Sequence, residues 1–318
     1  MSKTPTKLPC VHNNAAWPHD TAIVLSVLIP FYKDNPQKLL RALGQNPPLN
    51  VEVILYDDGS ADPDLSSAMD RATAKARLPV KLISAYENVG RSGARNALIK
   101  AARGQWVLFL DADMMPEDDQ FLRTWMACTQ NDNPAIAFGG FSVPPLGHIA
   151  PEMILHQAFS QNSDCLPAAE RAQNPAKHVC TSNLLVRRDV LNEHPFDNGF
   201  SGWGWEDVEW AARAARDYNI HHIDNPAQHL GLESAETLVR RFRDSAPNYA
   251  RFVKRHPDLA STLPSWKAAH VLRNVPGLAL VRPVFSAMAR DTSGLVPLSL
   301  RILALKLWRS CWYAKALS

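Results

Sequence analysis

The chain has 318 residues, 46% hydrophobic and 20% charged, a balance that supports a buried core and excludes wholesale disorder. Its formal net charge of +3 is too small to indicate a nucleic-acid partner. Five cysteines without a CxxC pair favour free thiols in a reducing compartment over a disulfide framework or a zinc site. The first 20 residues lack the apolar core of a signal peptide, and no uncharged apolar run is long enough to span a membrane. We therefore expect a cytoplasmic protein.

Apolar runs alternate with helical patterns through the first half of the chain. Strands are expected at 22–29, 51–56, 80–84 and 105–110, and helices at 36–45, 64–76 and 91–104. This alternation predicts an α/β fold with a mostly parallel sheet covered by helices.

The second half is less regular. It contains an expected helix at 117–130, a strand at 135–139, a long and partly helical excursion at 141–178, a strand at 180–186, a helix at 206–216 and a strand at 220–224. No internal repeat or low-complexity tract interrupts it. The elements therefore predict one continuous domain, followed by a C-terminal tail.

Polar side chains follow three of the expected strands at the point where each strand ends. These residues are Pro30, Tyr32 and Asp34 after the first strand, Asp57 and Asp58 after the second, and Asp111 and Asp113 after the last. Because the carboxyl ends of parallel strands meet at one edge of a sheet, one ligand with several polar parts is implied. Asp111 and Asp113 are tolerable side by side if a divalent cation binds between them, and such oxygen ligands suit Mg²⁺ or Mn²⁺ together with phosphate. A DxD or a DDGS turn by itself is common, so the order and spacing of the pieces carry the interpretation.

Four segments together resemble family-2 glycosyltransferases of the GT-A fold. They are SVLIPFYKD (26–34), VEVILYDDGSAD (51–62), ENVGRSGARNALIKAARGQWVLFLDADMMPED (87–118) and FSGWGWEDVEWAARAAR (200–216). The GWGWED part is also similar to the GWGGED segment of galactosyltransferase-like and N-acetylgalactosaminyltransferase-like enzymes, with Trp205 in place of the last glycine of that pattern. The resemblance implies a GT-A domain over 22–235, with a nucleotide half at 22–140 and an acceptor half at 141–235. Residues 236–318 would form a helical extension.

The resemblance implies a site for the nucleotide of a UDP-sugar donor and for a metal ion. The implied nucleotide-binding residues are Pro30, Phe31, Tyr32, Asp57, Asp58, Arg91, Arg95 and Asp111. Arg91 and Arg95 are one helical turn apart and can face the same base edge or diphosphate. Asp113 would coordinate the Mn²⁺ or Mg²⁺ with Asp111 beside it, and the ion would neutralise charge on the departing diphosphate.

The second half of the chain would supply the acceptor site and a base. Glu206 and Asp207 begin an expected helix, where carboxylates are also ordinary helix-start residues. The preceding indoles and glycine, Trp203, Gly204 and Trp205, can pack on a sugar ring, and Asn183 is assigned to the same site. Following the family pattern, Asp207 would be the base and Glu206 an acceptor ligand. A base opposite the leaving group implies inversion.

His229 is the histidine with the most informative position. It follows the expected strand at 220–224, and in related GT-A enzymes a histidine at this place completes the metal site. A surface or core histidine is the alternative.

The tail at 298–317 reads as one helix. Leu300, Leu303, Leu307 and Cys311 share a face. The charged side chains of this segment are all basic, and it contains no Asp or Glu. The helix can either lie on an anionic membrane as a peripheral contact or pack back on the domain.

The expected function is an inverting, metal-dependent transfer of a hexosyl or N-acetylhexosaminyl group from a UDP-sugar to a glycan or lipid-linked acceptor, in surface polysaccharide biosynthesis. The protein would then work in the cytoplasm or at the inner face of the cytoplasmic membrane. The alternatives are a non-catalytic sugar-binding scaffold of the same fold and a sugar-1-phosphate nucleotidyltransferase. The nucleotidyltransferase lacks support, because such an enzyme needs a Gly-rich loop after the first strand and PFYKDNPQ is not one. A phosphatase is disfavoured by the residues that follow the DxD.

Overall fold

The computed structural model describes residues 8–18 and 21–318. Residues 1–7, 19 and 20, which belong to the N-terminal stretch where no signal peptide is expected, lie outside the described residues. All five cysteines are free, as the sequence predicts.

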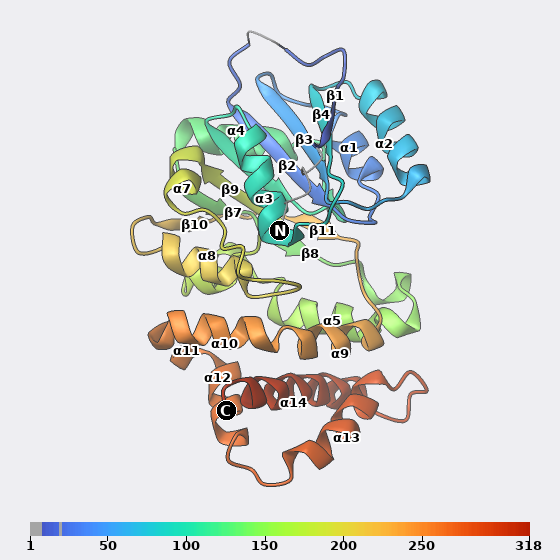
Figure 1. The fold of residues 1–318 in the computed structure, drawn as a ribbon, viewed down its shortest axis with the longest axis vertical. Helices are drawn as coiled ribbons and strands as arrows, with labels where there is room; N and C mark the ends of the chain where they lie inside the picture. The colour runs from blue at the N-terminus through green and yellow to red at the C-terminus, as the bar shows by residue number, and fades with distance from the viewer. Residues whose placement is uncertain (1–7, 19–20) are drawn as a thin grey trace, which may run out of the picture.

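A central eight-stranded sheet forms the upper part of the molecule in Figure 1. In spatial order its strands are β1 (Cys10–Asn13), β4 (Val80–Ser84), β3 (Val51–Asp57), β2 (Leu25–Phe31), β5 (Trp106–Leu110), β9 (Asn183–Arg187), β7 (Ile136–Phe138) and β10 (Ile220–His222). Strands β4, β3, β2 and β5 are parallel neighbours, which confirms the expected arrangement of the first half. Strand β9 runs antiparallel between β5 and β7, and β1 adds an unpredicted antiparallel edge.

Helices cover both faces of this sheet because its strands are apolar on both faces. Val27 belongs to one core and Leu28 to the other, as expected when successive side chains point to opposite faces. The first core is covered by α1 (Gln37–Leu43), α2 (Pro63–Lys75) and α4 (Phe121–Asn131). The second core is covered by α3 (Gly90–Ala101), α7 (Arg188–Glu193) and α8 (Glu206–Ala214). The predicted α/β fold is confirmed.

A second, three-stranded sheet lies at the carboxyl end of β5 and was not predicted. Its strands are β6 (Met114–Pro116), β11 (Ala227–His229) and β8 (Phe141–Ser142), with β11 in the centre. Because β11 pairs with β6, the chain near residue 229 is brought directly beside the end of β5.

The excursion at 141–178 is partly helical, as expected. It contains the short 3-10 helices η1 (Leu146–His148), η2 (Pro151–Met153) and η3 (Pro175–His178), and the α-helices α5 (Ile154–Ser163) and α6 (Ala168–Arg171).

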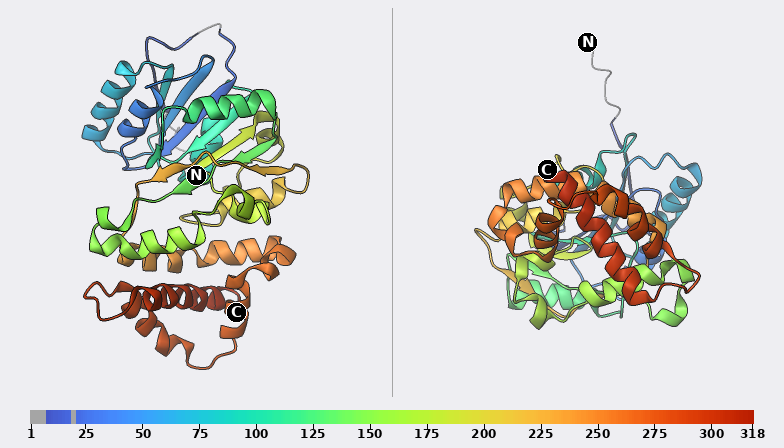
Figure 2. Two further views of the ribbon diagram at one scale, coloured as in Figure 1. Left: turned by 180° about the vertical axis from the view of Figure 1, so that it is seen from behind. Right: turned by 90° about the horizontal axis from the view of Figure 1, so that it is seen from below.

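The C-terminal part is helical and stacks below the sheet half in Figure 1 and, seen from behind, in Figure 2. Its helices are α9 (Ala235–Asp244), α10 (Ala246–Arg255), α11 (Pro257–Thr262), α12 (Pro264–Leu272), α13 (Leu278–Arg290) and α14 (Leu298–Ala316). Helices α5, α9 and α10 form the layer next to the sheet half, and α12, α13 and α14 form the layer farthest from it.

Helix α14 packs back on the protein. Its buried face carries Ala304, Leu305 and Trp308, which join side chains of α5 and α9 in one apolar cluster. The apolar face expected from the sequence is therefore only partly right, since Leu300 and Leu303 are 44% and 51% exposed. Within the described residues, no helix has the length and apolar character that a membrane crossing requires.

Candidate active site

A cavity of about 340 Å³ opens at the carboxyl ends of β2, β3 and β5, the edge that the sequence singled out. It brings together nine of the expected site residues: Pro30, Phe31, Tyr32, Asp58, Arg91, Arg95, Asp111, Asp113 and Trp203. Its walls therefore combine an aromatic strip, carboxylates and guanidinium groups, which is a suitable lining for a charged nucleotide with an aromatic base.

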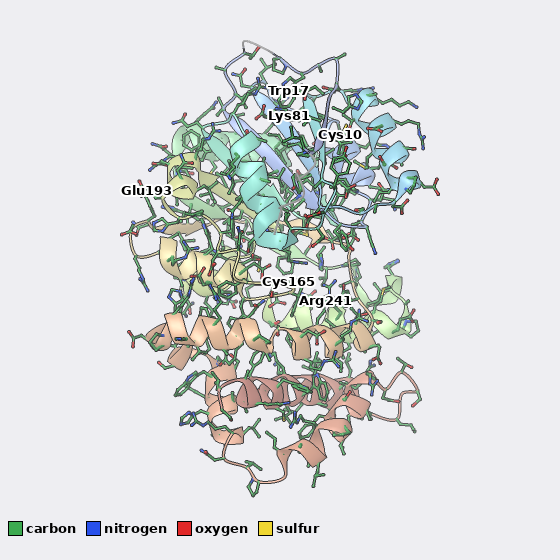
Figure 3. All side chains as sticks on the ribbon, viewed as in Figure 1. Cys10, Trp17, Lys81, Cys165, Glu193 and Arg241 are labelled. Carbon is green, nitrogen blue, oxygen red and sulfur yellow. The ribbon has the colours of Figure 1, made fainter. Side chains whose placement is uncertain are left out.

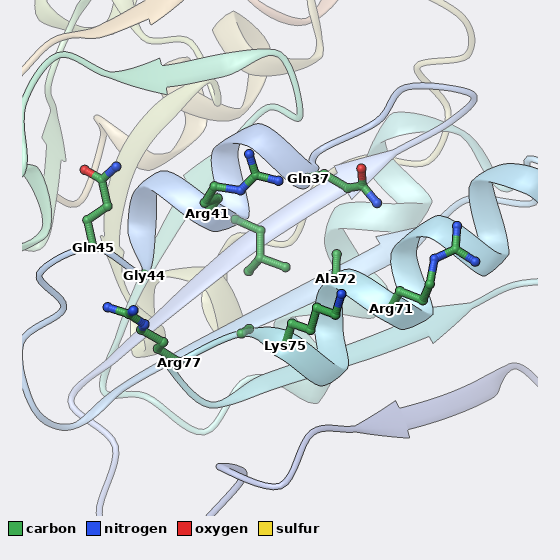
Figure 4. Close-up of a pocket in the computed structure, with 10 residues that line it drawn as sticks. Gln37, Arg41, Gly44, Gln45, Arg71, Ala72, Lys75 and Arg77 are labelled. Carbon is green, nitrogen blue, oxygen red and sulfur yellow. The ribbon is translucent and has the colours of Figure 1, made fainter.

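A larger cavity of about 470 Å³ lies elsewhere, between α1 and α2 (Figure 4). Four cationic side chains line it, Arg41, Arg71, Lys75 and Arg77, and no carboxylate does. We refer to it as the basic cavity. It lacks the groups that acid–base or metal chemistry requires, so the smaller cavity is the candidate active site.

The two aspartates that end β3 have different positions. Asp57 accepts a hydrogen bond from the Ser60 amide at 2.9 Å, which closes the turn, and its side chain is not part of the cavity lining. Asp58 lines the cavity and accepts from the amides of Val89 and Gly90 at 2.8 and 3.0 Å, at the start of α3. Burial raises the pKa of Asp58 to about 6. Asp58 thus joins the end of β3 to the helix that carries both arginines.

Arg95 is the centre of a buried cluster of charges. Its guanidinium lies 3.4 Å from Asp111, 3.3 Å from Glu206 and 3.5 Å from Asp207. Arg91, one turn earlier, lies 3.6 Å from Glu206. Three carboxylates facing two guanidinium groups leave one negative charge uncompensated, which a protonated group or a cation can balance. The cluster links the end of β5 to the start of α8.

Asp207 is the carboxylate of this cluster best suited to accept a proton. Its side chain is 20% exposed, against 5% for Glu206. Thr181 orients it through its amide and its hydroxyl, both at 3.2 Å. Burial and the neighbouring Glu206 raise the pKa of Asp207 to about 6. A carboxylate with this pKa is a stronger base than an ordinary aspartate and is still ionised at neutral pH.

The small sheet brings Asp113 and His229 together. His229 pairs in register with Met114, and the Leu230 amide donates to the Asp113 carbonyl at 2.9 Å. The Nε2 atom of His229 then lies 3.2 Å from Oδ2 of Asp113. Although burial opposes both changes, this contact lowers the pKa of Asp113 and raises that of His229. The expected proximity of these two residues is present, across 116 positions of sequence.

The donor set of this pair fits a divalent cation. The second carboxylate oxygen of Asp113, Oδ1, is buried and has no hydrogen-bond partner. Among the residues described, no three His, Cys, Asp or Glu side chains are grouped so that they could hold a metal by themselves. Asp111, the expected neighbour of Asp113 at the metal, contacts the Arg95 guanidinium. The residues therefore suit a divalent cation held by one carboxylate and one imidazole, with its other ligands from phosphate and water.

The two indoles of the GWGW segment separate. Trp203 lines the cavity, where its ring contacts Phe242 and the guanidinium of Arg241. Trp205 faces the C-terminal helices, with its ring 4.8 Å from that of Tyr249 and its Nε1 donating to the Tyr313 hydroxyl at 2.9 Å. The expectation that Trp205 offers its face to a sugar is therefore corrected. Gly204 is not part of the cavity lining either.

Asn183 also needs correction as an acceptor-binding residue. It is fully buried, and its amide group donates to the carbonyls of Gly140 and Asn225, both at 2.8 Å. Its oxygen accepts from Trp125 at 3.2 Å. Both hydrogens of its amide group and its oxygen are bonded within the core, so Asn183 holds the start of β9 in place.

Sequence reasoning missed two residues of this region. Arg241 of α9 lines the cavity, although it lies beyond the expected end of the domain at 235; Figure 3 shows it near α9, where the helical layer meets the sheet half. Thr181 holds Asp207. Neither has a local signal: Arg241 belongs to an ordinary basic stretch of a helix, and Thr181 meets its partner from 26 positions away.

The chain is also similar to known proteins. The model of the family "Glycosyl transferase family 2" matches residues 26–194, more than half of the chain. The chain is 31% identical over 231 residues to Glycosyltransferase AglE of Haloferax volcanii, which covers 69% of this chain and 71% of that protein. A shorter match, 33% identical over 93 residues and covering 29% of this chain and 31% of the other, is to the amylovoran biosynthesis glycosyltransferase AmsB of Erwinia amylovora.

Solved structures show the same fold. The chain resembles S. aureus TarS 1-349 in complex with UDP-GlcNAc, with a TM-score of 0.52, 17% identity, and coverage of 93% of this chain and 90% of that one. It also resembles the mannosyltransferase PcManGT of Pyrobaculum calidifontis in complex with GDP-Man and Mn²⁺, with a TM-score of 0.50, 18% identity, and coverage of 95% and 89%. These structures confirm a GT-A-like arrangement of a large sheet covered by helices. From the family match and the AglE alignment together, the chain belongs to glycosyl transferase family 2.

Proposed function

We propose that the protein is an inverting, metal-dependent glycosyltransferase that moves a hexosyl or N-acetylhexosaminyl group from a UDP-sugar to a glycan or lipid-linked acceptor. The observation that carries the proposal is Arg95, which joins Asp111 at the end of β5 to Glu206 and Asp207 at the start of α8. The cavity thus offers charge to a donor diphosphate, and the proposed base, Asp207, adjoins it through Arg95 without being part of its lining. The polysaccharide pathways named for relatives such as AmsB support a role in surface glycan synthesis.

The nucleotide would lie along the ends of β2 and β3. Tyr32 is 44% exposed and can cover a base, while Asp58 presents a carboxylate near the start of α3. Arg91 and Arg241 add two guanidinium groups to the same cavity. Each guanidinium group can bind two phosphate oxygens through two parallel hydrogen bonds. The UDP-GlcNAc bound by TarS supports uridine as the base, and the GDP-Man bound by PcManGT is the competing donor class.

Asp113 and His229 would hold the divalent cation, Mn²⁺ or Mg²⁺. The Mn²⁺ in the PcManGT structure supports a metal in this fold. When bound, the ion supplies positive charge next to the diphosphate as it leaves. Arg91 would add a second positive charge in the same cavity. Although burial opposes it, the neighbouring Glu206 raises the pKa of Arg91 above its ordinary value, so the guanidinium stays charged.

Asp207 would take the proton of the acceptor hydroxyl while that oxygen attacks the anomeric carbon. Thr181 and Arg95 keep the Asp207 carboxylate oriented before the acceptor arrives. Glu206 would bind another acceptor hydroxyl through its position beside Arg95. With the base on the side of the sugar opposite the departing diphosphate, the reaction would be a direct displacement that inverts the anomeric centre. We also assign Trp203 and the two carboxylates of the GWGWED segment to the acceptor side, in keeping with the similarity of this sequence to galactosyltransferase-like enzymes.

The roles of the parts of the chain follow the same division. Residues 22–140 would bind the nucleotide and 141–235 the acceptor, with Arg241 of the extension at 236–318 added to the donor cavity. A lipid-linked acceptor would bring the reaction to the inner face of the cytoplasmic membrane.

The test is donor hydrolysis with a panel of UDP- and GDP-sugars, in Mn²⁺ and in excess chelator. We expect one UDP-sugar to release UDP in Mn²⁺ and the chelator to abolish the release. Equal release in chelator would remove the metal from the mechanism, and release from a GDP-sugar alone would overturn the donor class. No release from any donor, with UDP still bound, would favour a sugar-binding scaffold.

A further inference from the structure

Exposed apolar side chains are concentrated in one short part of the chain. Sixteen large hydrophobic residues are exposed in the described chain, and eight of them lie between positions 271 and 303, about a tenth of its length. They are Val271, Val275, Leu280, Val281, Val284, Leu295, Leu300 and Leu303. Leu280 is 81% exposed and Leu295 is 86% exposed. Exposed apolar side chains that adjoin one another on a protein surface are typical of an interaction site.

Helix α13 shows this most clearly. Leu280, Pro283, Val284 and Ala287 are all exposed and follow one another at intervals of three or four residues, so they form one entirely apolar face. The opposite side of the helix faces the protein, because Phe285 and Met288 pack on the apolar cluster that contains side chains of α9 and α14. The outer face has no partner within the described chain.

The same segment is strongly basic. Residues 264–318 contain eight Lys and Arg and one acid, Asp291, a net charge of +7 (8 − 1), so the remaining 263 residues carry −4 (3 − 7). The carboxylate of Asp291 is used locally, since it accepts from the amides of Ser293 and Val296 at 3.2 and 2.9 Å. Arg290 is paired with Glu236 of α9 at 2.8 Å, so it is discounted. Lys267 and Arg273 flank the exposed Val271 and are themselves exposed.

We propose that the outer face of α13, together with the loops on either side of it, docks on the surface of an anionic lipid bilayer. We call this surface, defined by Val271, Val275, Leu280, Val284 and Leu295, the outer apolar face. An apolar stripe bordered by cations is the pattern of a surface that lies in the headgroup layer. Helix α14 contributes only at its start, because most of its apolar side chains are buried. The proposal stands on surface chemistry and does not depend on the proposed reaction.

A second copy of the chain fits this face less well. A symmetric dimer places the same patch on both sides of the contact, so the exposed cations Lys267 and Arg273 of both copies would be brought to one interface. A bilayer containing anionic lipid offers the opposite charge along with an apolar layer. In the view from below in Figure 2, the C-terminal helices lie in front of the rest of the molecule, so a flat surface can approach them.

Vesicle sedimentation of the full chain tests the proposal. The vesicles are phosphatidylcholine alone, or phosphatidylcholine with about one third phosphatidylglycerol. We expect binding to the anionic vesicles only, and a fall of about tenfold or more when salt is raised to about 0.5 M. The variant Leu280→Glu with Val284→Glu should lose the binding, and Lys267→Glu with Arg273→Glu should weaken it by about tenfold.

Matched controls come from the sheet half of the chain. Leu49→Glu changes a leucine that is 87% exposed, and Lys75→Glu with Arg77→Glu removes two cations from the basic cavity; both should bind vesicles as the unaltered protein does. Far-ultraviolet circular dichroism and a thermal melt establish that each variant is folded. All changed side chains are exposed, so the fold is expected to persist.

Three results would overturn the proposal. The first is no sedimentation of the unaltered chain with anionic vesicles at low salt. The second is vesicle binding that survives both variants of the outer apolar face or is lost with the basic-cavity control. The third is a dimer in lipid-free buffer that Leu280→Glu dissociates, without any vesicle binding, which would assign this face to contact between copies.

Discussion

The Asp113 carboxylate packs closely against the backbone of Gly231. A Cβ atom at position 231 would collide with the Asp113 side chain, so only glycine leaves that carboxylate where it lies. We expect Gly231→Ala to displace the Asp113 carboxylate and to weaken Mn²⁺ binding by about tenfold or more, because a displaced ligand loses its geometry. Titration of Mn²⁺ by electron paramagnetic resonance, in the presence of UDP, measures the affinity.

The control for this change is Gly147→Ala, since a Cβ there meets nothing within 4 Å. This variant should bind Mn²⁺ as the unaltered protein does. Unchanged affinity in Gly231→Ala would mean that Asp113 is not a metal ligand.

Asp207 is the proposed base, and its replacement by asparagine keeps the shape of the side chain. Asp207→Asn should lower kcat by about 10²- to 10⁴-fold, the usual contribution of a positioned base, with UDP affinity changed by less than about threefold. Isothermal titration with UDP and steady-state kinetics give the two numbers. If Asp207→Asn loses UDP affinity and Glu206→Gln loses only rate, then the two roles are reversed.

The pKa of Asp207 predicts a pH profile. Burial and Glu206 raise this pKa to about 6, and the base must be ionised to accept a proton. The rate should therefore be nearly constant above neutral pH and fall about tenfold per pH unit below about 6, the acid side of the transition. The profile of kcat/KM measures this. A rate that stays level down to pH 4.5 would exclude Asp207 as the base.

At the scale of elements, the C-terminal helices hold the loop that precedes the proposed base. Trp205 has a left-handed backbone conformation, with φ of 74°, which is costly for a residue with a bulky side chain. It is held by the Tyr313 hydroxyl of α14, and Asn248 of α10 donates to the carbonyls of Ser201 and Gly204 at 2.9 Å. Helices α10 and α14 thus fix the start of α8, where Glu206 and Asp207 lie.

Tyr313→Phe tests this contact. The ring remains stacked on Tyr249, but the hydroxyl that accepts from Trp205 is lost. We expect the free energy of unfolding to fall by about 1 kcal/mol, and kcat to fall severalfold with the donor KM unchanged. Tyr218→Phe is the control, because its hydroxyl contacts Glu193 at an exposed position. An unchanged kcat in Tyr313→Phe would confine this contact to stability.

At the scale of the whole molecule, donor and metal should stabilise the fold together. Ligands that bind only the folded state add about 2.7 kcal/mol at a hundredfold excess over their dissociation constant. Thermal unfolding with Mn²⁺ and UDP should show this gain in the unaltered protein, and both Asp113→Asn and His229→Ala should lose it. His12→Ala breaks another His–Asp contact of 3.3 Å, with Asp70 at the surface, and should retain the gain. A full gain in His229→Ala would remove His229 from the site.

The parallel core of the sheet could be predicted from local patterns. The runs that became β2, β3 and β5 are mostly apolar and buried along almost their whole length, as expected of strands covered on both faces. Once these strands are parallel, their carboxyl ends meet, and the positions of Asp58, Asp111 and Asp113 around one cavity follow from the order of the chain.

Long-range pairing decided the rest. The antiparallel direction of β9 and the small sheet that brings His229 to Asp113 depend on contacts between distant segments. The strands of the small sheet have only two or three residues, too few for their pattern to show their partners. The burial of Asn183 and the turning of Trp205 toward Tyr313 have the same origin. The sequence by itself therefore determined which chemical groups meet at the edge of the sheet, since hydrophobic periodicity is local. Only the tertiary structure decided which of them face the cavity and which support it, since that depends on what packs behind each side chain.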